Sequence, residues 1–247
     1  VSGTKGIEAV SIGRNTSVTA NYGFALGTST SVSGNAANSI AIGISSTALN
    51  NASNALVIGK SSSVSSNAVG SVVVGQSTSV AGNMRNSVAL GVSNNMSGNG
   101  NGAVAMGYLV NVSGNSGIRV GIGSNVTART GVAIGLNSSA SGSGSNSVAI
   151  GSGNYASYGG VAIGKNVSQS GSGSGFAIGR DITTSSKGMV IGINSSATRS
   201  SLAIGSGATA SGTNSVSLGT GTVAGSPGST RPNIVAVGFR TSVTGNS

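Results

Sequence analysis

The chain has 247 residues, of which 44 are glycine, and it contains neither cysteine nor histidine. Without these residues it has no disulfide, no thiolate or imidazole metal ligand and no Ser–His or Cys–His pair for nucleophilic catalysis. Twelve basic and two acidic residues give a net charge of +10. No run of eighteen apolar residues occurs, so we predict no membrane-spanning helix.

A short pattern recurs along the chain: small, apolar, small, aliphatic, glycine. Residues 147–151 (Ser-Val-Ala-Ile-Gly) are a typical copy, and we call the last residue of each copy its closing glycine. The predicted closing glycines are Gly13, Gly27, Gly43, Gly59, Gly75, Gly91, Gly107, Gly123, Gly135, Gly151, Gly164, Gly179, Gly192, Gly205, Gly219 and Gly238. They stand sixteen residues apart from Gly27 to Gly123, and mostly twelve to sixteen residues apart afterwards. A short, nearly constant period predicts a solenoid in which each repeat forms one coil.

Each repeat is predicted to hold two β-strands. In the first strand, apolar residues stand one and three positions before the closing glycine, mostly with alanine between them, and this alternation is typical of a strand. A second, more polar strand is centred five residues after the glycine, where only Gln169 and Thr184 interrupt an apolar column. Glycine or polar turns join the strands. We therefore expect an all-β parallel β-roll of about sixteen two-strand coils, about 75 Å long at ~4.8 Å per coil.

The first strand is apolar or small on both faces, which indicates burial on both sides. Val148 and Ile150 lie on one face and Ala149 on the other. The residues that we assign to this core or subunit-contact strand are Val88, Leu90, Val132, Ile134, Val148 and Ile150. The interior of one roll uses only one face, so we predict that the other face packs against further copies of the chain. The sequence leaves open which face does which.

We expect one repeat domain over residues 1–247, with an insertion loop at about residues 220–234. Both prolines, Pro227 and Pro232, lie in this insertion, and proline cannot donate a hydrogen bond to a strand ladder. Because the chain begins within the repeat pattern, we expect it to be part of a longer protein.

The repeat resembles that of a known family. Residues 146–151 followed by Ala156, and residues 38–43 followed by Ala48, resemble the head repeat of YadA-like trimeric autotransporter adhesins. The resemblance implies a left-handed parallel β-roll assembled as a homotrimer. It also implies a cell-surface head that binds host extracellular matrix or glycans through its repetitive outer surface. Such a head is extracellular and is held in the outer membrane by parts that this stretch does not contain.

Two features keep other functions open. Similar repeats occur in bacteriophage tail fibres, so a tail-fibre segment on a virion, or another structural fibre, is the alternative. The commonest period here is also longer than the family's usual repeat. An ice-binding surface is disfavoured, because the residues that flank the second strand are mixed rather than a regular threonine array.

The two acidic residues do not form a catalytic or metal-binding pair. Glu8 and Asp181 are predicted to lie eleven coils apart, about 50 Å at ~4.8 Å per coil, and Asp181 stands beside Arg180. Paired-carboxylate chemistry needs a separation below about 10 Å. We therefore expect no enzymatic activity, no cofactor and no metal.

The basic residues offer a candidate surface for an anionic partner. Arg14, Lys60, Lys165 and Arg180 each follow a closing glycine directly, so the repeat places them on one edge of the roll. Such an edge would attract an anionic glycan, and the alternative interpretation is solubility. Nucleic acid is disfavoured because the bases are dispersed and few aromatic residues are available for stacking. The aromatic residues that lie near turns, as glycan platforms or as turn packing, are Tyr22, Tyr108, Tyr155, Tyr158 and Phe239.

Overall fold

The structure is a computed structural model, and it describes residues 6–113, 116–142, 146–226 and 233–244. All the regular elements in these ranges are β-strands, thirty in number. The chain divides into two compact units, Val1–Thr130 (unit 1) and Gly131–Ser247 (unit 2). Each unit is a parallel β-solenoid, which confirms the predicted fold class.

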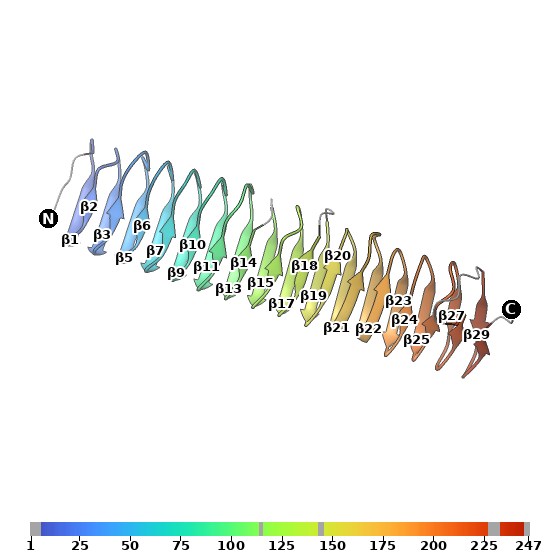
Figure 1. Cartoon of the computed structure of the whole chain (residues 1–247). Coiled ribbons are helices and arrows are strands. Elements are labelled where there is room, and N and C mark those ends of the chain that lie inside the picture. The colour runs from blue at the N-terminus through green and yellow to red at the C-terminus, as the bar shows by residue number, and fades with distance from the viewer. Residues whose placement is uncertain (1–5, 114–115, 143–145, 227–232, 245–247) are drawn as a thin grey trace. The chain divides into compact units, whose positions relative to one another are not determined.

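Unit 1 consists of two parallel ladders (Figure 1). The ladder of first strands contains β1 (Val10–Arg14), β3 (Phe24–Thr28), β5 (Ile40–Ile44), β7 (Leu56–Lys60), β9 (Val72–Gln76), β11 (Val88–Val92), β13 (Val104–Tyr108) and β15 (Ile118–Ile122). The ladder of second strands contains β2 (Ser17–Val18), β4 (Ser31–Val32), β6 (Thr47–Ala48), β8 (Ser63–Val64), β10 (Ser79–Val80), β12 (Asn95–Met96), β14 (Asn111–Val112) and β16 (Asn125–Val126). Each strand pairs with the equivalent strand of the next coil, as Gly43 does with Gly59.

Unit 2 repeats this arrangement. Its first strands are β17 (Val132–Leu136), β19 (Val148–Ser152), β23 (Met189–Ile193), β25 (Leu202–Ser206), β27 (Val216–Leu218) and β29 (Val235–Val237). Its second strands are β18 (Ser139–Ser141), β20 (Tyr155–Ser157), β24 (Ser196–Ala197), β26 (Thr209–Ala210), β28 (Val223–Ala224) and β30 (Ser242–Val243). Two longer strands, β21 (Val161–Ser170) and β22 (Phe176–Ser185), run through both positions without a break.

The predicted insertion loop lies between β28 and β29. Residues 227–232, which include Pro227 and Pro232, lie outside the described residues. The ladder is in register on both sides of them, because Val216 of β27 pairs with Val235 of β29. The expectation that all the repeats form one domain remains a prediction.

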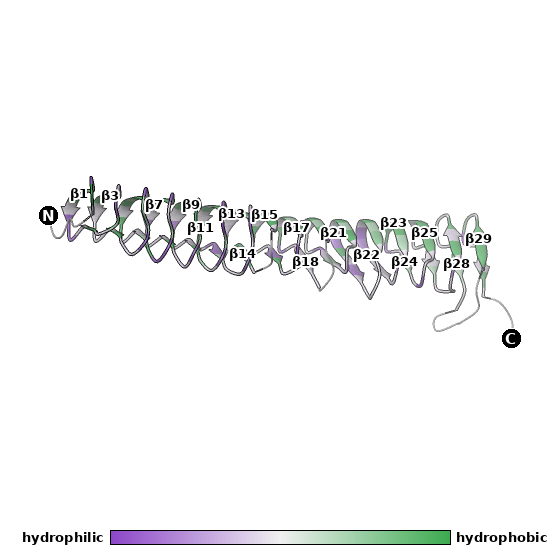
Figure 2. Cartoon of the chain, turned by 90° about the horizontal axis from the view of Figure 1, so that it is seen from above, coloured by the Kyte–Doolittle hydropathy of each residue, from purple (hydrophilic) through white to green (hydrophobic). Residues whose placement is uncertain are grey.

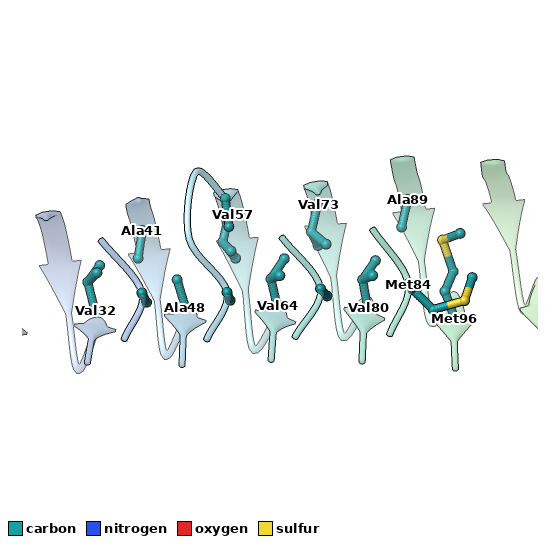
Figure 3. Close-up of a cluster of buried hydrophobic side chains, with 14 of the residues drawn as sticks. Val32, Ala41, Ala48, Val57, Val64, Val73, Val80, Met84, Ala89 and Met96 are labelled. Atoms are coloured by element: carbon teal, nitrogen blue, oxygen red, sulfur yellow. The ribbon is translucent and has the colours of Figure 1, made fainter. Parts of the chain in front are cut away.

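The structure shows which face of the first strand lines the interior of the solenoid. The residue between the two apolar residues of each first strand, which we call its middle position, points inward. It is alanine, valine or serine in every first strand except β15, and Ala41, Val57 and Ala149 have no exposed surface. Figure 3 shows Ala41 and Val57 of the first strands pointing toward Ala48 and Val64 of the second strands. The larger residues on either side of the middle position point outward, as in β5, where Ile40 remains 38 % exposed. The core of each coil is therefore narrow and built largely from alanine and valine.

The closing glycine lies within the first strand and not in the turn that the sequence predicted. Gly151, for example, is part of β19 with a φ of 127°. A Cβ on Gly151 would lie 1.9 Å from the carbonyl oxygen of Gly164 in the next coil. Glycine is needed here for its backbone conformation and for this close approach. The chain reverses two residues later, at left-handed residues such as Asn137 (φ 51°) and Asn166 (φ 53°).

One predicted closing glycine is wrong. Gly121, and not Gly123, pairs with Gly107, and its φ of 135° matches the other closing glycines. Gly123 has a φ of 62° and occupies the left-handed turn position. The prediction failed because both positions favour glycine, so a Gly-x-Gly sequence fits two registers. The structure's register gives two coils of fourteen residues, whereas a closing Gly123 would leave only twelve residues before Gly135.

The two polar residues that interrupt the second-strand column still point inward. Gln169 is fully buried, and its Oε1 accepts a hydrogen bond of 2.8 Å from the Ser157 amide. Its Nε2 donates a hydrogen bond of 3.1 Å to the Gly173 carbonyl. Thr184 is also buried, at 2 % exposure. The interior therefore accepts Gln169 with its hydrogen bonds made inside the coil, whereas the buried Thr184 Oγ1 has no hydrogen-bond partner among the described residues.

Candidate functional site

The described residues contain no cluster of three or more His, Cys, Asp or Glu side chains that could hold a metal. Asp181 lies in the turn position of β22, where its Oδ1 accepts a hydrogen bond of 2.8 Å from Asn166 Nδ2. Its other oxygen is 3.6 Å from Arg180 Nε. These contacts give Asp181 a structural role at a coil turn. Within the same ranges, no helix is long and apolar enough to cross a membrane.

The outward face of the first strands is the principal apolar surface of each unit. Aliphatic residues lie one and three positions before each closing glycine, and Figure 2 shows this concentration of apolar residues in the first strands. The residues assigned from the sequence to the core or subunit-contact strand all lie on this outward face and are half-buried: Val88, Leu90, Val132, Ile134, Val148 and Ile150. They do not enter the interior. An aliphatic row on every coil leaves a continuous apolar face on each unit, which is typical of a surface that binds another chain.

The four edge cations lie on the border of this apolar face. Arg14, Lys60, Lys165 and Arg180 are each the residue after a closing glycine, and all four are exposed. Lys165 and Arg180 occupy neighbouring coils in direct register. Arg14 and Lys60 stand three coils apart in unit 1, roughly 14 Å at ~4.8 Å per coil. The structure brings only Lys165 and Arg180 together, and Asp181 partly neutralises Arg180.

Hydroxyl groups form part of the outward face of the second strands, which we call the hydroxyl face; at the same position β12, β14 and β16 hold asparagine and β28 holds Val223. In unit 1, Ser31, Thr47, Ser63 and Ser79 pair in register from one coil to the next and are partly exposed. In unit 2 the same position holds Thr183, Ser196 and Thr209, also in register. The residue after each of these points inward. This polar face lies on a different side of the coil from the apolar face.

Two further polar features occur at the turns of unit 1. The side chains of Asn51, Asn67, Asn83 and Asn99 form an exposed ladder with amide–amide hydrogen bonds of 2.9, 3.2 and 3.0 Å. Closer to the N-terminus, a cleft of about 310 Å³ is lined by Thr19, Ala20, Asn21, Gly34, Asn35, Ala37 and Ser53. Both features present amide, hydroxyl and backbone groups that suit a polar ligand such as a sugar.

The aromatic residues are exposed but dispersed. Tyr155 is 40 % exposed on the hydroxyl face, between Ser139 and Ser168 of the neighbouring coils. Tyr158 lies at the following turn of the same coil and is 43 % exposed. Near the C-terminus, the Arg240 guanidinium lies 5.0 Å from the centre of the Phe239 ring. Only Tyr155 and Tyr158 therefore form a pair within one coil among these aromatic residues.

One unusual residue was not found from the sequence. Arg119 is one of the dispersed basic residues, and a closing Gly123 would place it just before the first strand. In the structure it occupies the inward middle position of β15 and has no exposed surface. Burial lowers the pKa of its guanidinium to about 9. With Gly121 as the closing glycine, Arg119 takes the position between Ile118 and Val120, and the structure shows that this position points inward.

The family comparison matches the repeats described above. The family model named "YadA head domain repeat (2 copies)" matches residues 5–30, 127–154 and 199–222. A search of curated proteins found no match. The matched segments include first strands, closing glycines and left-handed turns that recur in both units. The YadA head family is a family of structural adhesin repeats, which suggests an adhesin-like function. The matched repeats and the fold together support a YadA-like head domain.

Proposed function

We propose that the chain is the non-enzymatic head of a trimeric cell-surface adhesin, which binds host extracellular matrix or glycans through its repetitive outer surface. The observation that carries this proposal is the separation of two faces in every coil. One face is aliphatic and suits contact with further copies of the chain. The other carries hydroxyl or amide side chains in most coils, which suit a target in water.

The apolar face supports the homotrimer. Ile12 and Ile40 of unit 1 remain 50 % and 38 % exposed, and Val235 of unit 2 remains 59 % exposed. Leaving such rows in water on successive coils is unfavourable by about 25 cal/mol per Å² of apolar surface. Packing against copies of the same chain removes this surface from water. YadA-like heads assemble as trimers, so we assign the aliphatic rows to the trimer contact.

The hydroxyl face supports binding of a polar target. Ser31, Thr47 and Ser63 project from consecutive coils, so donors and acceptors repeat every ~4.8 Å. A trimer displays three such faces, and a target with repeated binding groups engages several coils at once. Each contact is then weak, and multivalency supplies the affinity. The surface of the cell is the place where this head would act.

The edge cations support an anionic glycan as one target. Lys165 and Arg180 stand one coil apart and border the apolar face. In a trimer they lie at the rim of the subunit contact and remain in water. Sulfate or carboxylate groups of a glycan accept hydrogen bonds from such pairs.

The assembly is tested by sedimentation equilibrium, for which we expect a single trimeric species at micromolar concentration. A folded monomer contradicts the subunit contact. The trimer is then applied to a panel of matrix proteins and to a glycan array. Binding that is lost when Ser31 and Thr47 are changed to Glu supports the hydroxyl face, whereas a trimer that binds neither panel contradicts adhesion.

Heparin chromatography distinguishes binding by the Lys165 and Arg180 pair from binding by the net positive charge of the chain. The variant Lys165→Ala/Arg180→Ala should elute from heparin at lower salt than Lys187→Ala/Arg199→Ala. Both variants remove two exposed cations from unit 2. Equal elution of the two variants contradicts the edge site.

A further inference from the structure

Arg119 places a positive charge inside unit 1. It lies on β15 between Val120 and the exposed Ile118, and it pairs in register with Ala105 of the preceding first strand. In the other first strands of unit 1 this inward position holds a small residue: Ser11, Ala25, Ala41, Val57, Val73, Ala89 or Ala105. The arginine is therefore a specific exception within a regular core.

The guanidinium has no partner among the described residues. Its Nε, Nη1 and Nη2 atoms are all buried without a hydrogen bond. With a pKa of about 9, Arg119 carries its charge at neutral pH. A buried charge without a partner is strongly unfavourable, and buried charges in folded proteins are normally paired with a group of opposite charge.

The chain itself offers no counter-charge for this site. Its two acidic residues are Glu8 and Asp181. Glu8 precedes β1, seven first strands before β15, or roughly 30 Å away at ~4.8 Å per coil. Asp181 belongs to unit 2 and contacts Arg180 and Asn166. Within one copy of the chain, neither acidic side chain therefore compensates Arg119, which leaves a dissolved anion as its counter-charge.

The interior at this coil restricts the anion to a small one. Gly117 occupies the inward position two residues before Arg119, where Ser39, Ser71 and Ser87 stand in other coils. Gly117 adds no side chain and Ala105 only a methyl group, so the inward positions next to Arg119 on its own coil and on the preceding coil hold small residues. The rest of the core is lined by residues no larger than valine or methionine. We propose that Arg119 holds a small inorganic anion of the size of chloride inside unit 1, through its otherwise unpaired N–H groups.

Thermal unfolding of the full chain tests the site. Chloride replaces gluconate at constant ionic strength, because gluconate is too large to enter the interior. If the folded state binds chloride, the unfolding midpoint rises with chloride concentration, by about 3 °C between roughly 10 and 500 mM. Arg119→Met removes the charge and keeps the length of the side chain, and this dependence should then disappear. Arg85→Met is the matched control, because it removes one exposed arginine from the same unit and should retain the dependence.

Crystals of the unaltered chain grown with bromide give an independent result. We expect an anomalous scattering peak within hydrogen-bonding distance of the Arg119 guanidinium. An equal chloride dependence in Arg119→Met, or crystals without bromide at this position, would overturn the proposal. The bromide experiment remains decisive if the substituted chain does not fold.

Discussion

Gly205 lies directly against Gly219 of the next coil, so that a Cβ on Gly205 would stand 2.2 Å from the Gly219 carbonyl oxygen. The same approach recurs between closing glycines in both units, at 1.7–2.0 Å for most of them. This close approach between coils, rather than turn formation, explains why glycine recurs at the closing position of the repeat. It also defines the most sensitive position of each coil.

We predict that Gly205→Ala destabilises unit 2 by about 3 kcal/mol or more, because it combines a steric overlap with a φ of 141°. Gly207→Asn is the matched control two residues later. Gly207 has a φ of 68°, and its nearest neighbouring atom would lie 3.8 Å from an added Cβ. Asparagine already occupies this turn position in other coils, so the control should change stability by no more than about 0.5 kcal/mol. Denaturant unfolding measures both; equal losses would contradict the distinction between strand and turn glycines.

Gln169 and Gly160 form a second pair that we expect to be coupled. A Cβ on Gly160 would stand 1.9 Å from Gln169 Oε1, so the long side chain uses the space left by the glycine. The preceding coil has Ser147 and Ala156 at these two positions. We predict that Gly160→Ser and Gln169→Ala each cost about 2 kcal/mol, through overlap in one case and lost packing and hydrogen bonds in the other.

The double variant recreates the combination of the preceding coil. It should therefore be more stable than the sum of the single effects predicts, by about 1 kcal/mol or more. A double-mutant cycle in denaturant measures this difference. Strict additivity would show that the two positions do not share the same space.

Much of this fold follows from the sequence because each coil repeats the same pattern of apolar residues and glycine. The alternation in residues 148–151 predicts a strand, and the period predicts stacked coils. The sequence did not distinguish the two faces of the first strand, because Ala149 and Ile150 are both apolar. Residue size decides between them: the narrow interior takes alanine, and the larger Ile150 lies outside.

The candidate surfaces were predictable only in part. The edge position of Lys165 and Arg180 followed from the repeat. The burial of Arg119 did not, because the sequence left open which face of the first strand points inward, and the choice between Gly121 and Gly123 does not decide this. A shift of two residues keeps the same side chains on the same face. The length of the following coil, and not the local pattern, selects the register.

The pKa of Arg119 predicts an unusual pH dependence in chloride-free buffer. Burial lowers this pKa from the usual range of a guanidinium to about 9, so the folded state disfavours the charged form. Below about pH 9 the residue is charged in both the folded and unfolded states, and the full penalty applies. Above about pH 9 the folded state loses a proton that the unfolded state retains, so the free energy of unfolding rises by up to about 1.4 kcal/mol per pH unit from this group. Denaturant unfolding between about pH 8 and 11 should show this rise relative to Arg119→Met. Parallel curves for the two proteins would contradict an internal charge.

Neighbouring residues of β19 separate the solenoid core from the trimer contact. Ala149 is fully buried inside the coil, whereas Ile150 lies half-buried on the outward face. Ala149→Asp places a carboxylate in the interior without a partner, so we predict a loss of about 3 kcal/mol or more and disruption of the coil. Ile150→Asp places the same charge on the outward face, where it opposes packing against another copy but leaves the interior intact. Far-UV circular dichroism should therefore retain a β spectrum for Ile150→Asp, while sedimentation equilibrium shows a shift from trimer toward monomer. If Ile150→Asp remains fully trimeric with unchanged thermal stability, the outward aliphatic row is not the subunit contact, and a different surface must hold the chains together.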